Sequence, residues 1–324
     1  MAKRKFKAAR QRKFGKPTPP VLNQMQPLSL AQCMIVKDEE KNIERALSWE
    51  QGIASERTVE DTGSTDRTVE KISVIVPTYN RESYLQNLIR FFLDQTYSNK
   101  ELLIADDSDK PCSMMPELCR EHSEIKYFYQ AKRQTIGEKR NQLLQVASGE
   151  LIAQFDDDDY YAPQYLETMH QTLLGSASDF LTLSRWFAYS APLNIFAYWE
   201  TDRRFPLHYR VSSSDVRIVS TEPHPPDFIE INLFGFGFSY FFRRRVFESV
   251  QYAPMNCGED YNFYCKLVQQ GFKTMTVPDE TGLVLHLLHQ SNTSLILPQY
   301  LLPTGLLSRF FDTRILRLAG YLKS

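Results

Sequence analysis

The sequence predicts an α/β protein built on a mostly parallel central sheet, and three observations indicate this class. Short apolar runs of strand length recur along the chain. They alternate with segments whose apolar residues lie three and four positions apart, the spacing of amphipathic helices. Polar and acidic residues follow directly after several of the runs. In open α/β sheets, ligands bind where parallel strands deliver their carboxyl ends, so this edge is the expected place of a site.

The predicted elements follow one another along the first half of the chain. Each strand is a short run rich in aliphatic or aromatic residues, and each helix repeats apolar residues every three or four positions. The strands are Ala31–Val36, Ile72–Val76, Leu102–Ala105, Lys126–Tyr129 and Leu151–Phe155. The helices are Glu39–Glu50, Arg81–Gln95, Gly137–Ala147 and Gln164–Leu174. A strand, a helix and the next strand would together form a βαβ unit.

The segment 178–242 has a different pattern, in which aromatic and polar stretches are interrupted by Pro206, Pro223, Pro225 and Pro226. Such interruptions are typical of strands separated by loops. Within this segment, residues 234–238 alternate phenylalanine and glycine. The alternation predicts a strand whose glycines mark either a bulge or a place that another group approaches closely.

The composition is that of a globular protein. The chain has 324 residues, of which 42% are hydrophobic and 24% charged, enough for one large domain or two ordinary ones. The five cysteines lack the paired spacing of a zinc site, so we expect a reducing compartment and no disulfide framework. Because no apolar stretch approaches the roughly 20 residues that cross a bilayer, we expect a cytoplasmic protein.

The first sixteen residues carry eight lysines and arginines and no acidic residue. They have little apolar surface to bury, so we expect residues 1–26 to be a disordered basic tail and linker. The tail either keeps the protein in solution or contacts anionic lipid at a membrane surface. We expect no nucleic-acid partner.

The sequence contains an internal echo. The stretch from Cys33 to Glu40, followed by Asp61–Asp66, parallels the stretch from Val74 to Arg81, followed by Asp106–Asp109. Only the second copy continues into an acidic cluster. We therefore interpret residues 27–71 as a partial duplicate of one βαβ design, and residues 72–294 as the main domain.

Four consecutive aspartates, Asp156 to Asp159, end the predicted strand Leu151–Phe155. Neighbouring carboxylates repel one another unless a cation lies among them, and carboxylate oxygens suit hard ions such as Mg²⁺ or Mn²⁺. The alternative is a solvated acidic loop that caps the following helix. The cluster alone leaves both interpretations open.

Three segments, Ile72–Asp109, Gly137–Tyr161 and Gly235–Ser294, together resemble the inverting glycosyltransferases of family 2, which have the GT-A fold. The matching motifs are the opening strand Ser73–Arg81, the turn Ala105–Ser108, the helix segment Arg140-Asn141, the Asp-x-Asp motif in Phe155–Asp159, the Glu-Asp motif in Cys257–Tyr261 and the late His segment His289–Ser294. The resemblance implies a GT-A nucleotide-sugar-binding sandwich over residues 72–294.

The resemblance also implies a role for eight residues. Asp260 would be the catalytic base, and Asp158 and His289 would hold the metal. The remaining five would bind the nucleotide sugar: Pro77, Tyr79, Asp107, Arg140 and Asp156. Each type of residue also has an ordinary structural use, as a turn former, a core aromatic, a solvated helix face or an acidic first turn of a helix.

The implied activity is the transfer of a sugar from a nucleoside diphosphate, with UDP the expected nucleotide, to a glycan, lipid-linked or protein acceptor. The reaction would be a single displacement with inversion, assisted by Mn²⁺ or Mg²⁺. One alternative is a sugar-nucleotide-binding or scaffold protein without turnover. Another is a sugar-1-phosphate nucleotidylyltransferase, which the absence of a glycine-rich loop after Val76 disfavours.

Residues 295–324 predict an amphipathic basic helix. Apolar residues recur at helical spacing among basic ones: Leu306, Leu307, Phe310, Phe311, Ile315 and Leu318, with Arg309, Arg314, Arg317 and Lys323. The helix either packs against the main domain or lies on a membrane surface, where lipid-linked acceptors reside.

Overall fold

The structure is a computed structural model that describes residues 31–36, 56–61, 70–289, 295–318, 320 and 322. The chain divides into two compact units between Thr68 and Val69. In the first unit, β1 (Ala31–Val36) and β2 (Glu56–Asp61) pair in parallel. The predicted strand Ala31–Val36 is therefore present, whereas the basic tail and the predicted helix Glu39–Glu50 lie outside the described residues.

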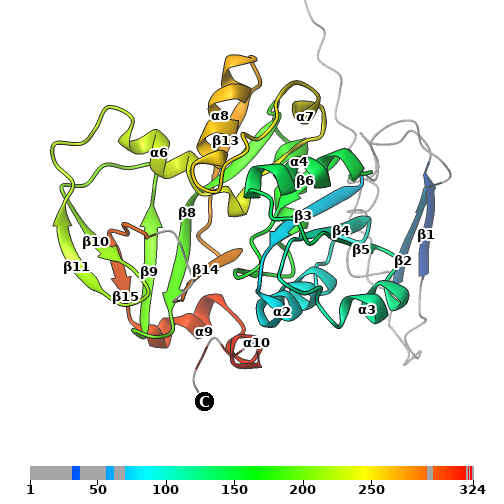
Figure 1. Cartoon of the computed structure of the whole chain (residues 1–324), viewed down its shortest axis with the longest axis horizontal. Coiled ribbons are helices and arrows are strands. Elements are labelled where there is room, and N and C mark those ends of the chain that lie inside the picture. The colour runs from blue at the N-terminus through cyan, green and yellow to red at the C-terminus, as the bar shows by residue number, and fades with distance from the viewer. Residues whose placement is uncertain are drawn as a thin grey trace, which may run out of the picture. The chain divides into compact units, whose positions relative to one another are not determined.

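The second unit contains one large mixed sheet and a separate hairpin (Figure 1). Its strands are β3 (Ile72–Thr78), β4 (Lys100–Asp106), β5 (Ile125–Tyr129), β6 (Leu151–Gln154), β7 (Tyr160–Tyr161), β8 (Phe180–Ser190), β9 (Ile195–Glu200), β10 (Leu207–Val211), β11 (Val216–Ser220), β12 (Phe241–Arg243), β13 (Thr274–Pro278), β14 (Val284–Leu288) and β15 (Tyr300–Leu302). Strands β10 and β11 form the hairpin, and the others form the 11-stranded sheet.

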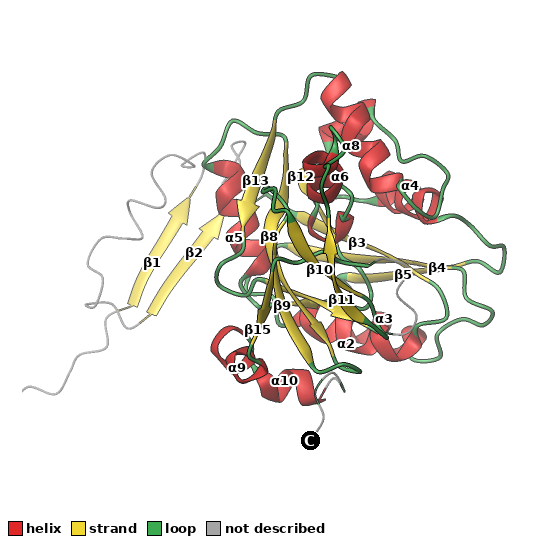
Figure 2. Ribbon diagram, turned by 90° about the vertical axis from the view of Figure 1, so that its left-hand side faces the viewer, coloured by secondary structure: helices red, strands yellow, loops and turns green. Residues whose placement is uncertain are grey.

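Helices lie on both faces of the large sheet, with α2 and α3 on one side and α4 and α8 on the other (Figure 2). The α-helices are α2 (Glu82–Leu93), α3 (Met115–Glu121), α4 (Ile136–Val146), α5 (Tyr165–Leu174), α6 (Phe228–Phe234), α7 (Arg245–Ser249), α8 (Glu259–Gln269), α9 (Leu307–Phe310) and α10 (Thr313–Leu318). Two 3-10 turns complete the unit, η1 (Gly237–Ser239) and η2 (Thr304–Leu306).

The parallel half of the sheet is ordered β6-β3-β4-β5, as βαβ units require. Every strand and helix predicted between residues 72 and 174 is present, with ends shifted by at most two residues. The alternation of side chains along each strand explains the two covered faces. In β3, Val74 and Val76 pack with the α2 side, whereas Ile75 packs with the α4 side.

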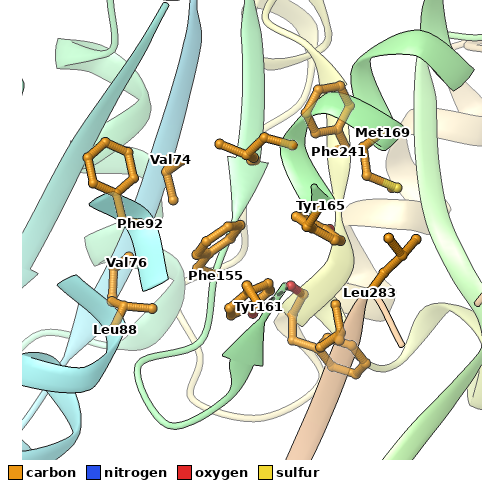
Figure 3. Packing of buried hydrophobic residues seen from close by; sticks show 14 of the residues in the cluster. Val74, Val76, Leu88, Phe92, Phe155, Tyr161, Tyr165, Met169, Phe241 and Leu283 are labelled. Atoms are coloured by element: carbon orange, nitrogen blue, oxygen red, sulfur yellow. Dashed lines mark hydrogen bonds between the residues drawn. The ribbon is translucent and has the colours of Figure 1, made fainter. Parts of the chain in front are cut away.

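The larger core lies between the sheet and helices α2 and α5 (Figure 3). Leu88 and Phe92 of α2 pack with the β3 side chains, and Phe155 stacks on Tyr161 with ring centroids 3.6 Å apart. Tyr161 also donates a hydrogen bond to the Phe238 carbonyl (2.9 Å), and its hydroxyl accepts one from the Asp156 amide (2.9 Å). The core therefore fixes the backbone on both sides of the acidic cluster.

Two predictions about local structure are wrong. Residues 234–238 form the end of α6 and part of η1, not a strand. Residues 295–324 do not form one helix, because β15 pairs with β9 and the helical part is broken into η2, α9 and α10. Pro298 and Pro303 remove backbone donors there, which disfavours a continuous helix.

Packing explains part of the amphipathic pattern at the C-terminus, although Leu306 of the predicted apolar stripe is 42% exposed. Leu307, Phe311 and Leu316 are buried, and they belong to a core cluster that includes Phe187 and Phe196. Their apolar face therefore covers the β8–β9 part of the sheet. Among the described residues, no helix combines the length and the apolar character that a membrane span requires.

Glu101 is the centre of a buried ionic cluster at the amino end of β4, the opposite end of the strand from the loop that follows Asp106. Its carboxylate accepts hydrogen bonds from Ser73 (2.7 Å), the Ser148 amide (2.8 Å), Lys126 (2.8 Å) and Lys71 (3.2 Å). Burial by itself raises the pKa of Glu101, but the hydrogen bonds outweigh it and lower the pKa to about 2.

We expect Glu101→Gln to reduce the free energy of unfolding by about 2 kcal/mol near neutral pH. Since the folded-state pKa is below the unfolded value, the carboxylate contributes stability above pH ~4.5 and loses it as pH falls toward ~2. The difference between variant and parent should thus shrink between about pH 7 and about pH 3. Urea unfolding at both pH values measures it, with the exposed Glu248→Gln as the charge-matched control. An equal difference at both pH values would contradict this account.

Candidate active site

The loops after three parallel strands meet at one edge of the sheet. In the register of the sheet, Thr78 of β3 lies opposite Asp106 of β4, and Ile75 of β3 lies opposite Gln154 of β6. The chain therefore delivers Tyr79, Asp107 and Asp156 to the same edge. Helix α8 adds a fourth contribution from a distant part of the sequence.

These loops line a cavity of about 590 Å³. Its lining includes six of the eight predicted site residues: Pro77, Tyr79, Arg140, Asp156, Asp158 and Asp260. The other two lie directly behind it, because Asp107 pairs with Lys139 and His289 pairs with Asp158. The structure thus brings the predicted residues together.

Within the acidic cluster, the four aspartates have different partners. Asp157 accepts hydrogen bonds from Thr78 (2.6 Å) and Arg81 (2.8 Å). Asp159 accepts them from His286 (2.9 Å) and the Leu287 amide (2.9 Å). The hydrogen bonds of Asp157 and Asp159 therefore stabilise the turn that carries the acidic cluster.

Asp158 remains ionised although it is buried. Burial raises its pKa, but the hydrogen bond from His289 Nε2 (2.8 Å) and the charge of Arg81, which also contacts it, outweigh burial and lower that pKa. Burial and the charge of Asp158, by contrast, raise the pKa of Asp157. The charge of Asp159 raises the pKa of His286 to about 9 against the effect of burial.

The cluster fits a divalent cation. One carboxylate oxygen from each of Asp156, Asp158 and Asp159 lies within 4.8 Å of the others. Because both Asp159 oxygens already accept hydrogen bonds, Asp156 and Asp158 are the better ligands. His289 Nε2 lies 2.8 Å from Asp158 Oδ2. Carboxylate oxygens with one imidazole suit Mg²⁺ or Mn²⁺. Arg81 shares Asp158, so a bound ion would lie beside a guanidinium.

The predicted base-binding corner is held together by cations. Asp107 is buried and accepts hydrogen bonds from Lys139 (2.7 Å) and the Gln134 amide (2.7 Å). Arg133 lies 2.7 Å from the same carboxylate and stacks over Tyr79, 3.3 Å from the ring centroid. A planar, hydrogen-bonding group therefore already occupies one face of Tyr79.

Asp260 lies in the first turn of α8, which follows Gly258. Gly258 has φ 79°, a left-handed conformation that glycine adopts without strain, and it turns the chain into the helix. Asp260 Oδ1 accepts hydrogen bonds from Arg140 (2.5 Å) and Gln154 (3.2 Å), whereas Oδ2 accepts one from the Gly237 amide (3.0 Å). Of its two oxygens, Oδ2 has the greater remaining capacity to accept.

Arg140 lies between the carboxylates of α8, Glu259 and Asp260, and the Asp156 carboxylate of the acidic cluster. It is 3% exposed and pairs with Glu259 (2.8 Å) and Asp260, and its other terminal nitrogen lies 3.6 Å from Asp156. Burial disfavours its charge, but Asp260 and Glu259 outweigh burial and raise the pKa of Arg140. These contacts favour a role in holding Asp260, while the predicted contact with phosphate stays a prediction.

Replacing Gly237 by alanine should disturb the site directly. A Cβ at Gly237 would lie 2.1 Å from Asp260 Oδ1 and 2.3 Å from Gln154 Nε2, too close for either side chain to stay in place. We expect Gly237→Ala to lower activity about a hundredfold, because a misplaced reacting group is costly. Gly305→Ala, where no atom of the described residues lies within 4 Å of an added Cβ, is the matched control for steady-state rates. Full activity of Gly237→Ala would contradict the close approach.

Sequence reasoning missed several residues of the site. Arg81, Lys139 and His286 surround the acidic residues, and Gln154 with Gly237 contacts Asp260. Gly237 had a signal, since the alternation of phenylalanine and glycine left a close approach open as the alternative to a strand bulge. Gln154 had none, because a polar residue at the end of an apolar run resembles any strand end.

Comparison with known proteins identifies the family. The family model described as glycosyl transferase family 2 matches residues 73–247, more than half of the chain. The chain therefore belongs to glycosyl transferase family 2, and it has the GT-A fold.

The chain is similar to several curated bacterial proteins. It is 26% identical to glycosyltransferase GlyA of Streptococcus pneumoniae over 59% of this chain and 27% of that protein, and 27% identical to GlyG of the same organism over 42% and 46%. It is 36% identical to a Campylobacter jejuni GalNAc(5)-diNAcBac-PP-undecaprenol β-1,3-glucosyltransferase over 31% and 34%. The match thus spans less than half the length of each relative.

A solved structure supports the fold. The crystal structure of S. aureus TarS superposes with a TM-score of 0.50 at 20% identity, over 67% of this chain and 37% of that one. At this identity the likeness shows the fold alone.

Proposed function

We propose that the protein transfers a sugar from a nucleoside diphosphate, with UDP the expected nucleotide, to an acceptor hydroxyl with inversion at the anomeric carbon. The observation that carries this proposal is that Asp158 and Asp260 line one cavity, with Asp156 and Arg140 between them. A donor diphosphate at the acidic cluster would present its anomeric carbon toward Asp260. The acceptor would enter from the side of α8.

In the proposed reaction, the acceptor oxygen attacks the anomeric carbon while the bond from that carbon to the diphosphate oxygen breaks. The acceptor proton passes to Asp260 Oδ2, because Oδ1 already accepts two hydrogen bonds. An aspartate is a weak base toward a free alcohol, so the transfer must be late, when the attacking oxygen has become acidic. The ion pair with Arg140 holds the Asp260 carboxylate in place for this step.

The leaving diphosphate needs positive charge near it. Lys139 and Arg81 lie at the cavity and can stabilise that charge, although both also pair with aspartates. Asp156, Asp158 and His289 would hold a divalent ion. When bound, Mg²⁺ or Mn²⁺ acts as a Lewis acid toward the diphosphate oxygens.

Tyr79 would receive the nucleotide base, with Pro77 shaping the loop beside it and Asp107 directly behind. The Asp107 carboxylate could accept a hydrogen bond from an imide N–H, which uracil offers and cytosine lacks, if Arg133 moved away from it. For base stacking on Tyr79, Arg133 would have to leave the ring face that it covers, or the base would have to use the other face.

We propose a glycan as the acceptor, carried on a lipid or a protein. The name of the Campylobacter jejuni relative describes a glucosyltransferase whose acceptor is an undecaprenol diphosphate-linked glycan. That likeness supports a lipid-linked glycan as the first acceptor to test. Contact with a membrane surface through the basic tail belongs to the same proposal.

A screen of nucleotide sugars tests the function. The purified full-length chain is incubated with UDP- and GDP-linked sugars, with and without Mn²⁺ or Mg²⁺ and with a lipid-linked glycan acceptor, and nucleoside diphosphate release is measured. We expect release with at least one UDP-sugar, raised by the metal. Donor binding without release under all conditions would instead indicate a binding protein.

A further inference from the structure

Gln154 and Tyr252 are two buried residues to which the catalytic scheme gives no role. Gln154 ends β6 and is 0% exposed, and Tyr252 lies in the loop before α8 and is 2% exposed. The Tyr252 hydroxyl donates to Gln154 Oε1 (2.8 Å), and Gln154 Nε2 donates to Asp260 Oδ1 (3.2 Å). The three side chains form a chain of hydrogen bonds that ends on the proposed base.

The direction of this chain is fixed by chemistry. Gln154 has one accepting oxygen and one donating nitrogen, so a hydroxyl that donates to its oxygen turns the NH₂ group toward Asp260. An NH₂ group can only donate and a carboxylate oxygen accepts, so the contact with Asp260 Oδ1 selects this orientation of the amide. The Tyr252 hydroxyl, which can donate or accept, donates to Oε1 and so holds the amide in that orientation.

Tyr252 is itself held firmly. Its backbone N–H and C=O both bond to the side chain of Asn141 in α4, each at 2.9 Å. Its ring stacks on Phe263 of α8, with centroids 4.1 Å apart and planes 6° apart. The hydroxyl is therefore anchored to the same helix that carries Asp260.

We propose that Gln154, held in orientation by Tyr252, is a positioning residue for Asp260, the proposed catalytic base. Together with Arg140 it occupies the accepting capacity of Asp260 Oδ1, and so directs the acceptor hydroxyl to Oδ2. Gln154 does not contact the donor in this scheme. Its loss should lower the rate of transfer and leave donor binding nearly unchanged. The inference rests on the proposed function, because it assigns Gln154 through Asp260.

The test compares Gln154→Met, Tyr252→Phe and the double variant in the full-length chain. Methionine keeps the volume of the side chain without its donor, and phenylalanine keeps the ring contacts without the hydroxyl. We expect kcat to fall about tenfold to a hundredfold in Gln154→Met and less in Tyr252→Phe, with the KM for the donor within about twofold. Because Tyr252 acts through Gln154, the double variant should be no slower than Gln154→Met.

Tyr165→Phe is the matched control, since its buried hydroxyl donates to the Ser239 carbonyl (3.3 Å), away from Asp260, and its ring belongs to the core. It should keep the parental kcat at a similar loss of thermal stability, which separates positioning from folding. Suppose that the parent is active. If Gln154→Met then keeps the full kcat, or if the effects of the two substitutions multiply in the double variant, the inference is overturned and the proposed function is not. A folded parent that transfers no sugar would overturn the proposed function, and the inference with it.

Discussion

Asp260→Asn should reduce the rate of sugar transfer about a thousandfold and leave the dissociation constant of the donor nearly unchanged. The asparagine amide has the size of the carboxylate but cannot take the acceptor proton. The NH₂ group of the asparagine would also face either the Gly237 amide or the Arg140 guanidinium, and both of these are hydrogen-bond donors. The loss should therefore fall on kcat.

Two measurements check this expectation. Steady-state transfer gives kcat, and calorimetric titration with the donor nucleotide gives its affinity. Glu248→Gln, exposed in α7, removes the same charge outside the cavity and should behave like the parent. If Asp260→Asn transferred sugar at the parental rate, another group would have to be the base.

The second large effect is expected at the acidic cluster. Asp158→Asn should abolish the stimulation by Mn²⁺ and lower the metal-dependent rate about a hundredfold. Within the acidic cluster, Asp158 is the aspartate whose pKa, against the effect of burial, is lowered by its hydrogen bond from His289 and the charge of Arg81, which favour its charged form. The neutral amide keeps the shape of the side chain but offers the ion no negative charge.

Calorimetric titration with Mn²⁺ alone provides a readout that does not depend on activity. The parent should bind Mn²⁺, and Asp158→Asn should bind it much more weakly. Glu248→Gln again serves as the charge-matched control. Equal Mn²⁺ binding by Asp158→Asn and the parent would remove Asp158 from the proposed ligand set.

The parallel half of the fold could be predicted because its signals are local. The apolar runs at β3, β4 and β6 and the periodicity of α2 and α4 lie within single segments of sequence, and hydrophobic burial acts on each directly. The segment 178–242 could not be predicted in the same way. The long strand β8 pairs with the strand that follows it, β9, but also with β12, β13 and β14, which come from distant parts of the chain. Such pairing depends on tertiary contacts rather than on local preference.

The C-terminal segment also shows what local sequence patterns cannot predict. Its amphipathic spacing correctly indicated an apolar face, but spacing alone did not distinguish a membrane surface from a protein core. The burial of Leu307, Phe311 and Leu316 beneath the β8–β9 region accounts for that face.

The sequence by itself determined the family and named the residues that carry the proposed chemistry, because motif residues and strand ends are written in contiguous segments. Only the tertiary structure decided how those residues are used. Arg140, 120 positions from Asp260, is turned onto that carboxylate rather than toward open solvent. Gln154, Tyr252 and Gly237 acquire their roles because folding brings their donors to one aspartate. Hydrogen bonds act over about 3 Å, and no pattern along the chain reports distances of that kind.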